Sequence, residues 1–117
     1  MAWIMRKRAQ TGWQSLALPD GVTGTAAIRR DESMVQVMLD SVRGLDGNAT
    51  VCVIPTGFGP VAIPKGMNQR NGIVCTTTGV ARPLSYIATG RALRVLSAQA
   101  SDTYSGVATW VTDEAVA

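Results

Sequence analysis

Histidine is absent from this chain of 117 residues. Its absence removes the commonest general base, and with it the Ser-His-Asp and Cys-His arrangements of nucleophilic catalysis. Only two cysteines are present, so neither a Cys₂His₂ nor a Cys₄ zinc site can form within one chain. The sequence also lacks a Walker-type phosphate loop, and its aspartates do not match the spacing of a calcium-binding loop. We therefore expect no cofactor, no metal and no catalytic residues.

Carboxylate pairs are the remaining route to acid–base chemistry, but the acidic residues are few and scattered. Asp40 lies on the polar side of an alternating segment, and an exposed strand face explains it. The other acidic residues considered fall in turns, where such side chains commonly bind nearby backbone: Asp20, Asp31, Glu32, Asp46 and Asp102. The chain is therefore not expected to be an enzyme.

Charged residues make up only 16% of the chain, against about a quarter in an average domain, and the net charge is +3. Arg6, Lys7 and Arg8 account for the whole excess, because acidic and basic residues are equal in number from Ala9 onward. The body is therefore neutral and has no evident basic face for a phosphate backbone. We expect neither nucleic-acid binding by the body nor a solvated, highly charged surface.

No segment is expected to cross a membrane, because the longest uncharged run, residues 47–64, contains several Gly and Pro. The apolar stretch Met1–Met5 precedes the basic cluster, the reverse of signal-peptide order, so we expect no export signal and synthesis in the cytoplasm. Cys52 and Cys75 each lie in an apolar run and are then expected to be reduced, buried and inert. A disulfide between neighbouring strands stays open, since spacing does not give the Cα separation.

The sequence is rich in β-branched side chains, with thirteen Val, twelve Thr and six Ile against two Glu and two Lys. Residues 34–42 alternate most clearly, with Val35, Val37 and Leu39 on one face. The pattern predicts about nine short strands: 13–18, 25–30, 34–42, 50–54, 61–63, 73–77, 84–88, 92–96 and 106–111. This predicts an all-β fold, an antiparallel β-sandwich or barrel with jelly-roll or Greek-key-like connections.

The turns between these strands carry their own signals. Residues 50–54 are expected to be buried on both faces, and Asn71-Gly72 resembles a type I′ hairpin turn. Further turns or loops are expected at 19–21, 31–33, 44–48 and 99–105. The run 55–60 predicts a rigid structural corner whose residues are Pro55, Gly57, Phe58, Gly59 and Pro60.

The organisation expected is an N-terminal arm at residues 1–12, a sandwich domain at 13–113 and a polar tail at 114–117. Trp13 and Trp110 are expected to be core or interface anchors. The arm is expected to dock on a partner through Trp3, Ile4, Arg6, Lys7 and Arg8. The alternative left open is that Trp3 folds back onto the body as part of an extra edge strand.

Several short motifs are spread over residues 13–113: Trp13-x-x-Leu16-x-Leu18, Ala27-x-Arg29-Arg30, Val35-x-Val37, the run Ile54–Pro60 and the end Trp110–Asp113. Together they resemble small β-sandwich domains of minor tail and fibre-tip proteins in phages that infect actinobacteria. In that family a Leu-Pro-x-Gly-Tyr/Phe-x-Pro corner closes one strand, and the domain ends in a strand followed by Thr-Asp.

The resemblance implies a non-enzymatic virion protein, usually a homotrimer, that contacts other virion proteins and faces the host, with a host surface glycan as a further candidate partner. In the family this domain commonly ends a long fibre chain, whereas here it begins close to Met1. A small sandwich with a short arm equally resembles a capsid decoration (cementing) protein. Tail and capsid both stay open, and a carbohydrate-binding module is the remaining alternative.

Overall fold

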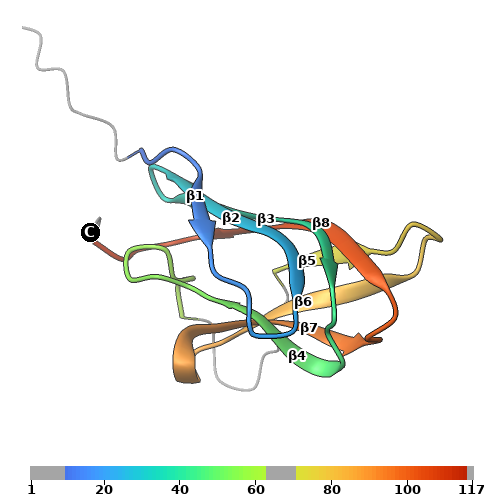
Figure 1. Cartoon of the computed structure of the whole chain (residues 1–117). Helices are drawn as coiled ribbons and strands as arrows, with labels where there is room; N and C mark the ends of the chain where they lie inside the picture. The colour runs from blue at the N-terminus through green and yellow to red at the C-terminus, as the bar shows by residue number, and fades with distance from the viewer. Residues whose placement is uncertain (1–9, 63–70, 116–117) are drawn as a thin grey trace, which may run out of the picture.

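A computed structural model describes residues 10–62 and 71–115 of the chain. Almost every regular element is a strand, and one short 3₁₀ helix is present in the described part (Figure 1). The strands are β1 (Gln14–Leu16), β2 (Thr23–Asp31), β3 (Met34–Arg43), β4 (Gly47–Val53), β5 (Gly72–Cys75), β6 (Ala81–Ile87), β7 (Ala92–Ala98) and β8 (Thr103–Val111), and the helix is η1 (Thr89–Arg91). The all-β prediction is confirmed, with eight strands in place of about nine.

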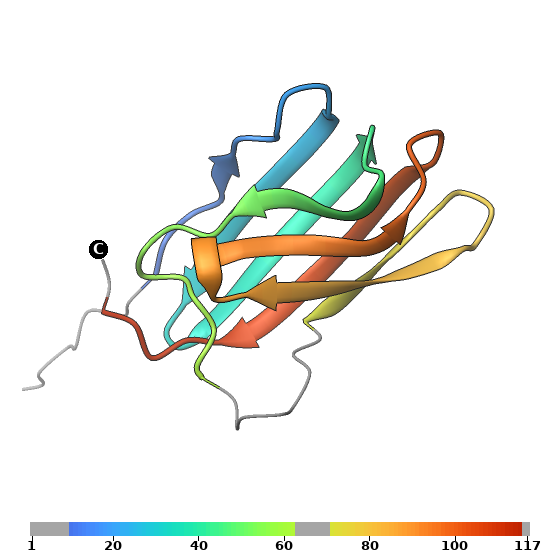
Figure 2. The same cartoon turned by 90° about the horizontal axis from the view of Figure 1, so that it is seen from below.

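All eight strands belong to one antiparallel sheet in the order β1-β2-β3-β8-β5-β6-β7-β4. The sheet curls over, so that β6, β7 and β4 lie across from β2, β3 and β8 (Figures 1 and 2). The pairing is nested: β3 pairs with β8, β4 with β7 and β5 with β6. The two layers expected of a sandwich are therefore parts of a single hydrogen-bonded sheet whose edge strands are β1 and β4.

The core fills the inside of this curl with every second residue of the strands. In β3 the inward residues are Val35, Val37 and Leu39, which are almost completely buried, as the period of two predicts. Tyr104 from β8 is the largest fully buried side chain. Leu45 is also fully buried, although it lies in a segment expected to be a loop. Each such side chain contributes roughly 1.5–3 kcal/mol relative to an exposed position.

Two expectations about turns and strands are wrong. Val61 and Ala62 are in no strand, because Pro60 cannot donate to a ladder and the chain is held here through Val61 N–H to the Val111 carbonyl, 3.0 Å. Ile63 lies outside the described residues. Gly72 is not in a turn but is paired inside β5, and a Cβ there would collide with the carbonyl of Val107 on β8. The glycine therefore serves a close strand approach.

One burial pattern and several strand boundaries also differ from the expected ones. Residues 50–54 are not buried on both faces, because β4 is an edge strand and Val53 is 59% exposed. The loop expected at 44–48 ends earlier, since β4 begins at Gly47. The loop expected at 99–105 is likewise shorter, because β8 begins at Thr103. At β4 and β8, pairing with a neighbouring strand begins the element earlier than the sequence pattern predicts.

Candidate functional site

The segment Pro55–Pro60 follows β4 and crosses one end of the curled sheet (Figure 2). Phe58 turns inward and joins the core, and its N–H donates to the Pro55 carbonyl over 3.2 Å. The indole N–H of Trp110, itself in the core, donates to the Phe58 carbonyl over 2.6 Å. The segment expected to be a rigid corner therefore has its backbone bonded to a buried strand residue.

Arg30 is the first of two arginines that hold this corner. Alternation along β2 turns Arg29 outward and Arg30 inward, where it is 7% exposed. Its guanidinium donates to three carbonyls, those of Glu32 (2.7 Å), Gly57 (2.6 Å) and Glu114 (2.7 Å). Hydrogen bonds from a charged donor offset the large cost of burying the cation.

Arg91 and Glu114 form the second set of contacts that hold this corner. Oε1 of Glu114 accepts from the N–H groups of Gly57 (2.9 Å) and Gly59 (2.8 Å) and from Nη2 of Arg91 (2.8 Å). Oε2 accepts from Nη1 of Arg91 (3.0 Å), which completes a bidentate pair. Arg91 also donates to the corner through the carbonyls of Ile54 and Pro55. We call Arg30, Arg91, Trp110 and Glu114 the corner latch.

The electrostatics of the latch follow from these contacts. The bond from Arg91 lowers the pKa of the Glu114 carboxyl from 4.5 to about 2, with help from the Gly59 and Gly57 N–H groups and against the effect of partial burial. The same contact raises the pKa of the Arg91 guanidinium. The pair is therefore ionised throughout the neutral range, and its charges cancel.

The sequence predicts the corner and a core or interface position for Trp110, but not the roles of Arg91 and Glu114. Glu114 was expected in a polar tail and Arg91 had no assigned role. The partners of their side chains are 23 or more residues away in the chain, so no local sequence spacing predicts the contact. One buried arginine is predictable at this point, because the adjacent Arg29 and Arg30 must point to opposite faces of a strand.

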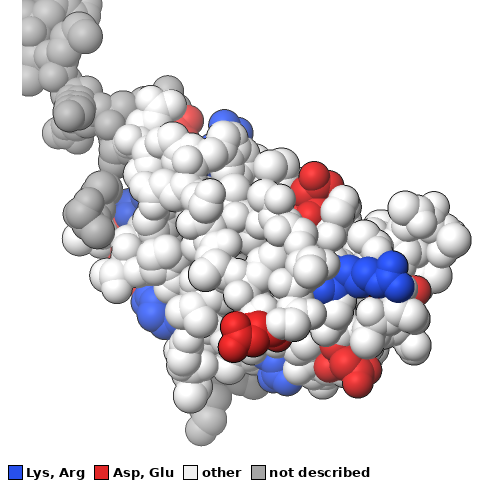
Figure 3. All heavy atoms as spheres, viewed as in Figure 1, with Lys and Arg blue, Asp and Glu red and all other residues white. Residues whose placement is uncertain are grey.

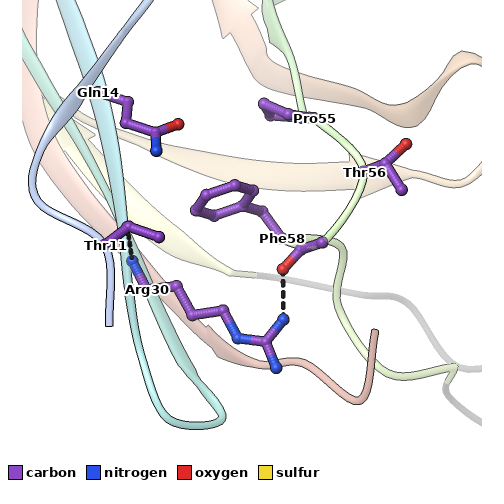
Figure 4. Close-up of a pocket in the computed structure, with 7 residues that line it drawn as sticks. Thr11, Gln14, Arg30, Pro55, Thr56 and Phe58 are labelled. Carbon is purple, nitrogen blue, oxygen red and sulfur yellow. Dashed lines mark hydrogen bonds between the residues drawn. The ribbon is translucent and has the colours of Figure 1, made fainter. Parts of the chain in front are cut away.

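A hollow of about 190 Å³ lies beside the corner, between it and the segment that leads into β1. Figure 4 shows Thr11, Gln14 and Arg30 on one side and Pro55, Thr56 and Phe58 on the other. The hydroxyl of Thr11 accepts from the backbone N–H of Arg30 over 3.0 Å. The lining holds no carboxylate, and the Arg30 guanidinium is engaged by backbone carbonyls, so this hollow offers no acid–base pair.

The acidic residues considered in the sequence form no metal-binding group in the described residues. Asp40 is exposed on β3, where its carboxylate accepts from the Ser41 hydroxyl over 3.2 Å. Within residues 10–62 and 71–115, no group of three or more Cys, Asp or Glu residues is arranged to hold a metal ion. No helix in that part is long and apolar enough to cross a membrane.

Exposed apolar side chains form two rows on the outward side of three adjacent strands, with the polar pair Gln36 and Thr109 between the rows. In β3 and β8, Met38 lies opposite Val107, and Met34 lies opposite Val111. Ile73 of β5 continues the first of these rows, because it pairs with Val107. These five side chains, which we call the outer face, are 38–57% exposed. On the side of the molecule seen in Figure 3, the charged side chains are scattered and form no basic stripe.

The remaining predicted residues have mixed outcomes. Trp110 is a core anchor as expected. Trp13 is 47% exposed, and Cζ of the Arg29 guanidinium lies over its ring, 4.7 Å from the ring centroid. Cys52 is buried and free as expected. Cys75 is free but exposed, because alternation in β5 turns Val74 inward instead. The expectation that both thiols are buried is therefore wrong.

The residues expected to dock on a partner lie outside the described residues: Trp3, Ile4, Arg6, Lys7 and Arg8. The docking role of the arm stays a prediction. No protein-family model and no curated protein matches the chain.

Proposed function

We propose that the chain is a non-enzymatic virion structural protein, a minor tail or fibre-tip component that works as a homotrimer. The observation that carries the proposal is the outer face, two rows of exposed apolar side chains on β3, β8 and β5 of a largely neutral body. A surface of this kind suits burial against a neighbouring subunit. The resemblance of residues 13–113 to phage tail domains supplies the biological setting.

The latch supports a mechanical role over a catalytic one. Its charged groups bind each other and backbone groups of the corner, and this fixes the chain where β4 ends and β8 leaves the sheet. A rigid end on a small domain preserves the shape of a surface that must fit a neighbour. Capsid decoration is the second form of the same proposal, because a decoration protein also needs a rigid body and one adhesive face.

Self-association in solution tests the proposal. Light scattering of the full chain should give about three times the 12.3 kDa of one chain at high protein concentration. Val107→Lys places a charge in the centre of the outer face and should shift the population to the monomer without lowering the melting temperature. Val80→Lys is the matched control, because Val80 is an exposed valine in the turn between β5 and β6.

A chain that is monomeric at every concentration contradicts the homotrimer. Equal behaviour of Val107→Lys and Val80→Lys contradicts the use of the outer face. Deletion of residues 1–8 tests the arm separately: a docking arm can be removed with little change in melting temperature, whereas a large decrease shows that the arm is part of the folded body.

A further inference from the structure

A second hollow, of about 410 Å³, lies next to the Arg91–Glu114 pair and shares no lining residue with the hollow in Figure 4. Its lining comprises Pro60–Ala62, Tyr86, Ala88, Arg91 and Glu114. The Tyr86 ring packs on the core, with its centroid 6.4 Å from that of Trp110. The hollow therefore combines an anchored aromatic ring and small apolar side chains with one charged pair.

The charged pair has hydrogen-bonding capacity beyond its structural contacts. An arginine carries five N–H donors. In the described residues four bonds leave Arg91, one from Nε, two from Nη2 and one from Nη1. One N–H on Nη1 remains, next to Oε2 of Glu114, which accepts only from Arg91 there. The unused N–H of Nη1 and the unused acceptor capacity of Oε2 thus lie on either side of an existing 3.0 Å bond, on two residues that line the hollow.

The backbone at Arg91 adds a second observation. Arg91 has φ = 52°, in the left-handed region that an arginine rarely adopts, and it follows Gly90 at φ = 74°. Such a conformation costs on the order of 1–3 kcal/mol and persists only where the surroundings impose it. The conformation fixes the guanidinium against the corner, so the donor is pre-oriented before any ligand arrives.

The chemistry of this hollow selects a ligand class. Two hydroxyl groups of one sugar ring can use these positions, one accepting from Nη1 and the other donating to Oε2. An anion is repelled by Glu114 and a cation by Arg91, so the neutral pair favours an uncharged ligand. The ring of Tyr86 and the apolar lining suit the C–H face of a sugar. We propose that this hollow binds a neutral sugar ring of a surface glycan.

This inference rests on the proposed virion role only for the source of the glycan, since binding is a property of the chain itself. The test is an NMR titration of the ¹⁵N-labelled full chain with the methyl glycosides of galactose, mannose, rhamnose and arabinose at tens of millimolar. We expect at least one to cause saturable shifts of the Gly57, Gly59, Tyr86 and Arg91 amide signals. No saturable shift with any of the four overturns the proposal.

Three variants locate the site. Ala88→Trp and Ala62→Trp each place a large ring at a lining position of the hollow and should weaken binding at least tenfold. If one variant fails to fold, the other still provides the test. Ala81→Trp is the matched control on β6, at an exposed alanine outside the hollow, and should bind as the parent does. Equal weakening by Ala81→Trp, or tighter binding of glucuronate than of the neutral glycosides, overturns the assignment. If the chain binds sugar but is absent from virions, the sugar site is supported and the virion role is contradicted.

Discussion

The guanidinium of Arg91 meets the carboxylate of Glu114 side by side, with Nη2 2.8 Å from Oε1 and Nη1 3.0 Å from Oε2. One residue ends the 3₁₀ turn before β7, and the other follows β8. Their contact ties the C-terminal end of the described chain to the corner after β4. The rigidity of this end of the molecule therefore depends on one ion pair and its backbone partners.

Glu114→Gln is expected to destabilise the fold. The change removes the charge that Arg91 and two backbone N–H groups bind, while size and shape are kept. Hydrogen bonds to a charged group are worth about 1.5–3 kcal/mol, and partial exposure puts the expected loss at about 1–2 kcal/mol in the free energy of unfolding. Urea denaturation measures it. Asp113→Asn, at the exposed neighbouring acid, should change stability by less than ~0.5 kcal/mol.

The same pair predicts a pH dependence. The pKa of Glu114 is about 2 in the folded chain and is expected near its ordinary 4.5 when the chain is unfolded. Because the folded value is the lower one, the stabilisation is complete above the unfolded pKa and is lost as the pH falls toward 2. The stability difference between the parent and Glu114→Gln should therefore be constant from pH 7 to pH 5 and shrink below pH 4. A difference that persists unchanged at pH 2 would falsify the assignment of Glu114.

Gly59→Ala tests the geometry of the latch without altering any charge. A Cβ at this position would lie 2.6 Å from Oε2 of Glu114 and 2.9 Å from Nη2 of Arg91, so the ion pair must move. We expect a loss of about 1–2 kcal/mol, most of which disappears when the change is made in Glu114→Gln. Gly12→Ala is the control, since nothing lies within 4 Å of a Cβ there. Full additivity of the two latch changes would argue against a shared contact.

The two thiols should react very differently. Burial raises the pKa of the Cys52 thiol to about 12, whereas Cys75 is exposed on β5. The thiolate is the reactive form, so a thiol reagent at pH 8 should modify one cysteine of the native chain rapidly. The second should react only after denaturation, and Cys75→Ser should abolish the rapid phase. Rapid modification of both thiols would show that β4 opens readily.

The sequence predicts the strands whose two faces differ most. Residues 34–39 alternate throughout, and β3 begins at the same residue, because one face of that strand is buried and the other is not. The register shifts between Leu39 and Val42, where the alternation is interrupted. The prediction fails at Asn71-Gly72, where the same dipeptide that favours a turn is used for close contact with β8. A local pattern cannot distinguish these two uses of glycine.

The candidate site is predictable only in part for a similar reason. The corner is visible from its own Gly and Pro residues, which are neighbours in the chain. Arg30, Arg91 and Glu114 reach it from three distant segments, and their convergence depends on the nested pairing of the strands. The outer face was likewise hidden, because the rows that join β3, β8 and β5 depend on strand order.

Quantitative mass spectrometry of purified virus particles, produced in cells that express the gene in its native setting, tests the central claim most directly. The account predicts that the chain is recovered as an intact structural component in a constant ratio to the major virion proteins. A few copies per particle fit a tail tip, and copies that follow the capsid protein fit decoration. Abundant chain in the lysate together with its absence from purified particles would contradict the account.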